Sequence, residues 1–70
     1  MSKTDAQKSE LSPAEIAVLD LIAAGLSNQA IAQKRGTSFH TVKNQVTRIF
    51  AKTGWTNRTK AAVMWRRATE

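Results

Sequence analysis

The sequence contains no cysteine, so a disulfide framework and the usual cysteine-containing zinc sites are excluded. Its apolar runs are short, whereas a membrane-spanning helix needs about 20 apolar residues in succession. The first residues, Met1 to Glu10, are polar and hold no apolar stretch of the kind found in a secretory signal. We therefore expect a cytoplasmic protein, associated with the nucleoid if its partner is DNA.

Acidic residues are also scarce, and their positions are uneven. Between Leu21 and Thr69 there is no acid at all. That stretch carries nine basic residues: Lys34, Arg35, Lys43, Arg48, Lys52, Arg58, Lys60, Arg66 and Arg67. A folded segment with this imbalance repels itself, and a polyanion is its usual complement. Basic charge that serves only solubility is one alternative. Binding to an anionic membrane is another, but the apolar residues are needed for a core.

The residues required for most enzyme chemistry are missing. The single histidine, His40, has no cysteine partner, and the acids lie before Leu21 or at the last position. No metal-binding cluster, Walker loop or G-x-G-x-x-G motif is present. Trp55 and Trp65 are expected to fill the core or an interface. The sequence therefore predicts a protein that is not an enzyme and needs no cofactor.

Helix start and stop signals are dense after residue 10. The segment Ser12-Pro13-Ala14-Glu15 has the pattern of a capping box, and Gly25 ends the helix that follows. Three further helices have candidate N-caps, which are Ser27, Ser38 and Asn57. The first two of these helices are followed by a glycine that should end them, Gly36 and Gly54. We expect an all-α domain over residues 11–70, preceded by a flexible polar tail at 1–10. Its four helices should span about residues 13–24, 28–35, 39–53 and 58–67 and contain a helix-turn-helix.

The third predicted helix has two contrasting faces. Its apolar residues recur at helical spacing and should face the core: Val42, Val46, Ile49 and Phe50. The opposite face combines cations with amides and hydroxyls: His40, Lys43, Asn44, Thr47, Arg48 and Lys52. Lysine pairs with guanine, asparagine with adenine, and threonine with phosphate or a thymine methyl group. A solvated polar face is the alternative for these residues alone, and the charge distribution favours DNA.

These segments together resemble the LuxR/GerE-type helix-turn-helix domain of bacterial transcriptional regulators. The resemblance rests on residues 11–15, 18–25, 27–32, 41–44, Lys52 and Asn57-Arg58, and covers roughly residues 11–67. It implies promoter binding, usually as a dimer, with the third helix in the major groove and the fourth helix at the dimer contact. Matched by position, the base-facing residues are Lys43, Asn44 and Thr47. The residues near phosphates are Asn28, Thr41, Arg48 and Lys52. His40 is added as a phosphate contact because it lies in the first turn of the third helix.

The fourth predicted helix is expected to form the dimer contact through Val63, Met64 and Trp65. Its cations, Lys60, Arg66 and Arg67, would repel one another across a two-fold axis. We therefore expect a weak homodimer that forms mainly on double-stranded DNA.

Other roles and partners remain open. The main alternative function is an anti-activator that pairs with a longer LuxR-type regulator, and RNA polymerase is a further possible partner. RNA binding is less favoured because the third helix has no aromatic stacking platform. The sequence is compatible both with a stand-alone regulator and with an excised C-terminal domain.

The chain departs from the family pattern at the turn and after the third helix. Arg35 and Thr37 stand where the family usually has aliphatic residues, and Thr53 stands where leucine is usual. We expect either looser packing of the second helix or an outward turn of Arg35. Trp55 should supply the volume that Thr53 lacks.

Overall fold

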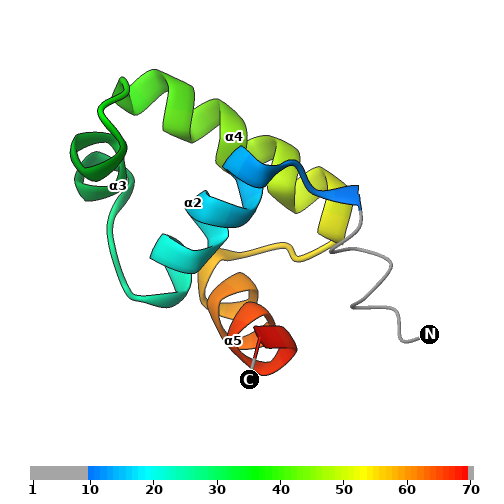
Figure 1. The fold of residues 1–70 in the computed structure, drawn as a ribbon. Helices are drawn as coiled ribbons and strands as arrows, with labels where there is room; N and C mark the ends of the chain where they lie inside the picture. The colour runs from blue at the N-terminus through cyan, green and yellow to red at the C-terminus, as the bar shows by residue number, and fades with distance from the viewer. Residues whose placement is uncertain (1–9, 70) are drawn as a thin grey trace.

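The computed structural model describes residues 10–69, which form a domain of four helices (Figure 1). The helices are α2 (Pro13–Ala23), α3 (Asn28–Arg35), α4 (Phe39–Thr53) and α5 (Arg58–Thr69). This part of the chain contains no strand, so the predicted all-α fold and its four helices are confirmed. The predicted flexible tail, apart from Glu10, lies outside the described residues.

Hydrogen bonds from backbone N–H groups to side-chain oxygens mark the helix starts as predicted. At α2 the capping box is complete: the Glu15 N–H donates to Ser12 Oγ at 3.2 Å, and the Ser12 N–H donates to Glu15 Oε1 at 2.8 Å. The other three helices begin after residues whose side-chain oxygen accepts a backbone N–H three positions later: Ser27, Ser38 and Asn57. Local capping therefore satisfies N–H groups that a helix leaves without an internal partner.

Glycines end α3 and α4 as predicted. Gly36 and Gly54 have φ angles of 67° and 78°, in the left-handed region that favours glycine. α2 ends at Ala23, one residue earlier than predicted, because Ala24 already serves as its C-cap. α5 extends to Thr69, two residues beyond the predicted end, since neither glycine nor proline follows to stop it.

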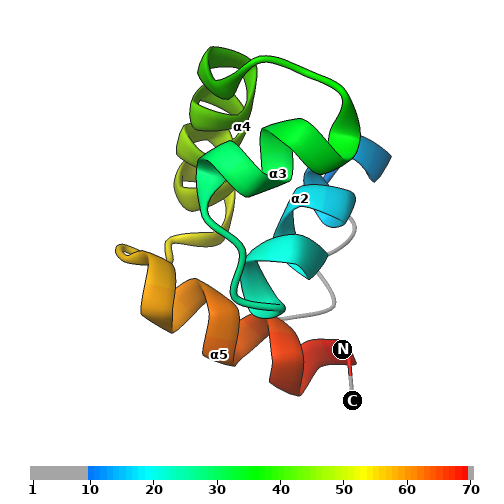
Figure 2. The same cartoon turned by 90° about the vertical axis from the view of Figure 1, so that its left-hand side faces the viewer.

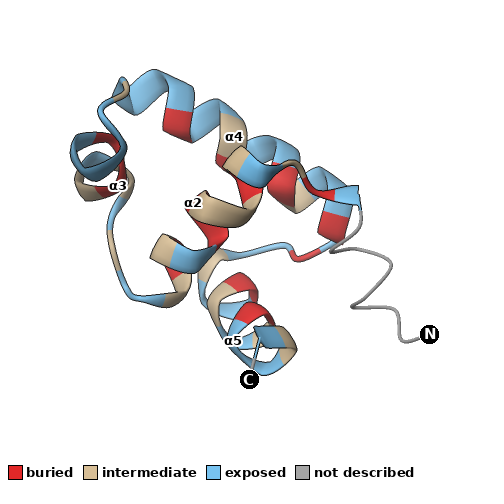
Figure 3. Ribbon diagram, in the orientation of Figure 1, coloured by how far each residue is buried: buried red, intermediate tan, exposed pale blue. Residues whose placement is uncertain are grey.

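Helix α2 lies at the centre of the domain and contacts the three other helices, while α3 packs against α4 (Figure 2). The buried residues face this centre (Figure 3). They come from all four helices, from the segment before α2 and from the loop between α4 and α5: Leu11, Val18, Leu19, Ile22, Ile31, Ala32, Val42, Val46, Ile49, Trp55, Ala61 and Trp65. One side of α4 packs against α2 and α3, so its other side faces away from the core.

Both tryptophans belong to this core. Trp55 is 4% exposed, and its backbone N–H donates to Thr53 Oγ1 at 3.2 Å. That its ring supplies the volume that Thr53 lacks stays a prediction. Trp65 is 1% exposed, and its Nε1 donates to Asp20 Oδ1 at 2.6 Å. This burial within one chain corrects the prediction that Trp65 lies in the dimer contact, because its ring is not available to a second copy.

Candidate nucleic-acid interface

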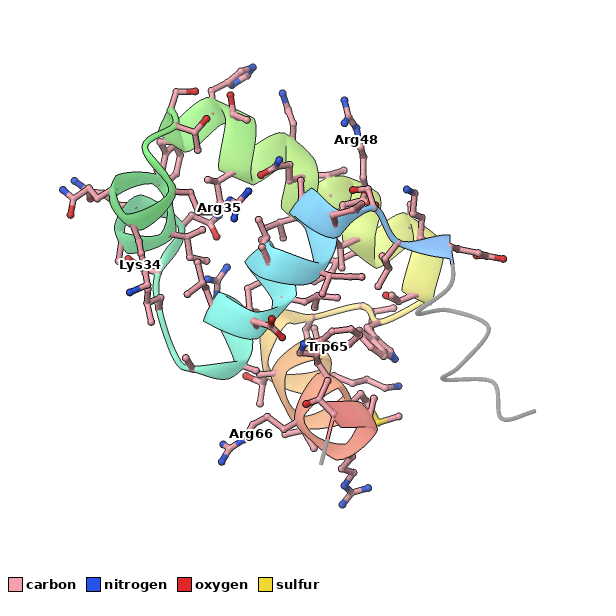
Figure 4. All side chains as sticks on the ribbon, in the orientation of Figure 1. Lys34, Arg35, Arg48, Trp65 and Arg66 are labelled. Atoms are coloured by element: carbon pink, nitrogen blue, oxygen red, sulfur yellow. The ribbon has the colours of Figure 1, made fainter. Side chains whose placement is uncertain are left out.

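Most apolar residues of α4 face the core, and its outer face is mainly polar. Val42, Val46 and Ile49 are buried against the other helices. Six predicted DNA contacts are exposed on the remaining surface of the same helix: His40, Thr41, Lys43, Asn44, Thr47 and Arg48. In Figure 4, Arg48 points away from the domain. The structure therefore brings the predicted base contacts together on one helix, with no side chain of the core among them.

Two hydroxyl groups on this face are held by bonds within α4 or to its cap. Thr47 Oγ1 donates to the Lys43 carbonyl at 3.0 Å. Thr41 Oγ1 lies 2.9 Å from Ser38 Oγ, the capping oxygen. Each hydroxyl oxygen still has acceptor capacity. These bonds fix the orientation of the threonine side chains, and they leave Lys43 and Asn44 as the two flexible donors at the middle of the face.

Asn28 lies at the start of α3, beside the helix-turn-helix, and is held from α5. Arg58 donates to Asn28 Oδ1 at 2.5 Å and to the Leu26 carbonyl as well. Burial lowers the pKa of Arg58, although a guanidinium stays charged at neutral pH. Because Arg58 occupies the amide oxygen, the NH₂ group of Asn28 is the part left to donate to a phosphate. The bond thus orients the group that a phosphate contact requires.

Lys52 is held by an acid from another helix. Its Nζ lies 2.7 Å from Oε1 of Glu15, the residue that completes the capping box of α2. The Glu15 side chain is almost fully buried, whereas that of Lys52 is 38% exposed. The hydrogen bond from Lys52, and then the one from the Ser12 backbone, hold the pKa of Glu15 below its usual value against the opposing effect of burial. Lys52 therefore ties α4 to α2, and its charge is partly neutralised.

Sequence reasoning missed one conspicuous residue of this face. Phe39 is the first residue of α4 and is 53% exposed. It was missed because Phe39 lies three residues before Val42 and seven before Val46, so by spacing it continues the apolar face and is expected in the core. The partners of Lys52 and Asn28 were missed for another reason: each partner is 30 or more positions away in the sequence.

Positive charge extends beyond α4. Lys34 and Arg35 are exposed at the end of α3, and Lys60, Arg66 and Arg67 are exposed on α5. Figure 4 shows Arg66 on the opposite side of the domain from Arg48. Within residues 10–69, no group of acidic or histidine residues could hold a metal ion. None of the described helices is long and apolar enough to cross a membrane.

Comparison with known families gives a match over most of the chain. The GerE model, which describes bacterial regulatory proteins of the luxR family, matches residues 9–65. The matched region includes α2, α3, α4 and the first part of α5. It therefore covers the whole helix-turn-helix described above.

Three curated proteins are similar to this chain. Response regulator Rre1 of Synechocystis is 43% identical over 76% of the chain and 23% of its own length. Transcriptional regulatory protein YdfI of Bacillus subtilis is 39% identical over 89% of the chain and 29% of its own length. The DNA-binding transcriptional activator DevR/DosR of Mycobacterium tuberculosis is 44% identical over 79% and 25%, respectively. The chain thus spans less than a third of each relative's length. No solved structure matches the chain significantly.

The lowered pKa of Glu15 predicts a loss of stability in acid. Glu15 binds a proton less readily in the folded than in the unfolded chain, so its ionised form stabilises the fold above its ordinary pKa of 4.5. That contribution disappears as the pH falls through the lower folded pKa. We expect the melting temperature, followed by circular dichroism, to fall below pH 4.5 and to fall less in Glu15→Gln.

At neutral pH, Glu15→Gln should cost about 1 kcal/mol, since the bond to a partly exposed lysine is weakened and not left wholly unmade. Glu10→Gln, which alters an exposed acid, serves as the control and should follow wild type. An equal acid-induced loss in wild type and Glu15→Gln would contradict this account.

Proposed function

The chain belongs to the luxR family of bacterial regulatory proteins, and we propose that it reads a specific promoter sequence with α4 in the major groove. As a LuxR-type helix-turn-helix, it is the DNA-binding domain of a transcriptional regulator. The family consists of DNA-binding regulators and not of enzymes, which confirms the non-enzymatic prediction. The observation that carries the proposal is the outer face of α4, exposed and free of acids.

The chemistry of this face assigns a role to each group of residues. Lys43 and Asn44 read base edges, and Thr47 supplies a methyl group and a hydroxyl beside them. The phosphate contacts surround these three: Asn28, His40, Thr41 and Arg48. Lys52 adds to the positive potential, but its bond to Glu15 makes it a structural residue first. Phosphate contacts set the register of α4, and base contacts select the sequence.

The experiment that tests the proposal is selection of genomic fragments by the purified chain at two salt concentrations, followed by binding titrations on the best site. If about five phosphates are neutralised by each copy, the slope of log K against log salt should be about −4 to −5. A slope shallower than about −2 would contradict the proposed phosphate contacts. Failure to enrich any sequence over random fragments would contradict sequence-specific reading.

Lys43 and Arg48 offer a matched pair of cations on α4 with different proposed roles. Lys43→Ala should lower the preference for the best site over random DNA by about 1–3 kcal/mol, because a base contact is lost. Asn44→Ala should act in the same way. Arg48→Ala should weaken binding to both DNAs by a similar factor, since a phosphate contact carries no sequence information. If Lys43→Ala weakens specific and random DNA equally, Lys43 is a phosphate contact and the assignment is wrong.

One recognition helix contacts too few bases to select a single site in a genome, which favours binding by two copies. About three base-reading side chains, each worth about 1–3 kcal/mol, give too little discrimination for a genome. We propose that two copies pair through α5 on half-sites about 10 base pairs apart. Val63 is 45% exposed on α5, and Met64 is half-buried beside it. The exposed cations Lys60, Arg66 and Arg67 oppose this pairing, so DNA that screens them should promote it.

Val63→Asp tests the pairing without altering α4. We expect wild type to be mostly monomeric in sedimentation at micromolar concentration and to bind a palindromic site cooperatively, two copies to one duplex. Val63→Asp should abolish the cooperativity and leave binding to a single half-site nearly unchanged, because a buried carboxylate would disrupt the contact. Undiminished cooperativity in this variant would place the contact elsewhere. Stable pairing with a longer LuxR-type regulator, with no binding to DNA, would favour the anti-activator role instead.

A further inference from the structure

Phe39 is an exposed aromatic side chain at the leading end of the helix proposed to enter DNA. It is 53% exposed, more than Val63 at 45%, the other large hydrophobic residue exposed within residues 10–69. Its neighbours Ser38, His40 and Thr41 are exposed as well. The ring therefore contributes only in part to the core, and its exposed half is presented at the N-terminal end of α4.

Phe39 shares a face of α4 with Lys43. Residues four apart on a helix lie on the same side, one turn above each other. Val42 is fully buried beside them. Phe39 thus lies between the buried stripe of α4 and its polar outer face, next to the lysine proposed to read a base. In helix-turn-helix proteins, the N-terminal residues of the recognition helix are the ones that contact base edges.

The charges around Phe39 indicate the chemistry of the partner that its ring can contact. There is no acid between Leu21 and Thr69, and the charged residues of α3 and α4 are exposed cations: Lys34, Arg35, Lys43, Arg48 and Lys52. An apolar ring in such surroundings requires a partner that is anionic overall and presents an apolar group. Duplex DNA meets both requirements, because the C5 methyl group of thymine is the apolar group that its major groove offers.

We propose that Phe39 is a specificity-determining residue that contacts a thymine methyl group in each half-site. This assignment rests on the proposed function, in which α4 lies in the major groove. Four residues of helix rise about 6 Å, and successive base pairs are about 3.4 Å apart. The thymine therefore lies one or two base pairs from the base pair that Lys43 reads.

Replacement of thymine by uracil removes this methyl group and nothing else. The test uses a single half-site recovered by selection, so that pairing through α5 does not contribute, with each thymine replaced in turn. Wild type should bind about fourfold more weakly when one thymine is replaced, the loss expected for one buried methyl group. That thymine should lie one or two base pairs from the position whose preference is lost in Lys43→Ala.

The variant Phe39→Ala completes a double-mutant comparison. It should bind the thymine half-site about tenfold more weakly than wild type, since burial of most of a phenyl ring is lost, and should be insensitive to uracil at the same position. Thr59→Ala, which truncates an exposed side chain of α5 that has no proposed role in binding or pairing, should behave as wild type on the half-site. The melting temperature of Phe39→Ala should stay close to that of wild type, because the ring is more than half exposed.

Two results would overturn the inference while sequence-specific binding stands. One is a wild-type protein that tolerates uracil at every position of a half-site it otherwise selects. The other is an equal sensitivity to uracil in wild type and Phe39→Ala, which would assign the methyl contact to another side chain. If the chain enriches no sequence at all, the proposed function fails first and the assignment of Phe39 falls with it.

Discussion

The carboxylate of Glu15 joins the two helices on which the binding surface depends. It accepts from the Ser12 N–H at the start of α2 and from Lys52 near the end of α4, at 2.8 and 2.7 Å. An almost fully buried carboxylate is tolerated because both bonds, one of them to a cation, replace lost water. The pair fixes the C-terminal part of α4 against the central helix. A helix held in this way can present its outer face at one defined angle to a DNA groove.

Two of the three acids within residues 10–69, Glu15 and Asp20, make contacts inside the domain, and neither lies on α4. Glu15 is buried against Lys52, and Asp20 accepts the indole N–H of Trp65 at 2.6 Å. Both acids come from α2, which lies behind α4 and α5 and not on the face proposed to meet DNA. Acids on the outer side of α4 would oppose phosphates directly. The placement of Glu15 and Asp20 on α2 therefore links the stability of the core to the electrostatics of the proposed binding face.

Local patterns were sufficient to predict the helices, and long-range pairs were not. The caps at Ser12, Ser27 and Ser38 act within three residues, so the sequence itself contains both partners of each bond. The bonds of Lys52 and Arg58 join residues 37 and 30 positions apart, which only the packing of helices brings together. For the same reason, apolar content alone could not separate the buried Trp65 from the exposed Val63 on one helix. The exposure of the candidate site residues on α4 was predictable because a single amphipathic helix carries them.

The burial of Trp65 changes what α5 can offer to a second copy. With the indole committed to the core, the apolar part of the outer face is reduced to Val63 and the half-buried Met64. Exposed cations at Lys60, Arg66 and Arg67 share the helix with this small patch. A contact of this size gains little from apolar burial and loses free energy to repulsion between like charges, which salt and phosphates reduce. In the assembly proposed above, pairing through α5 and binding to DNA are therefore linked, because a duplex that holds two copies at a fixed spacing lowers the repulsion between them.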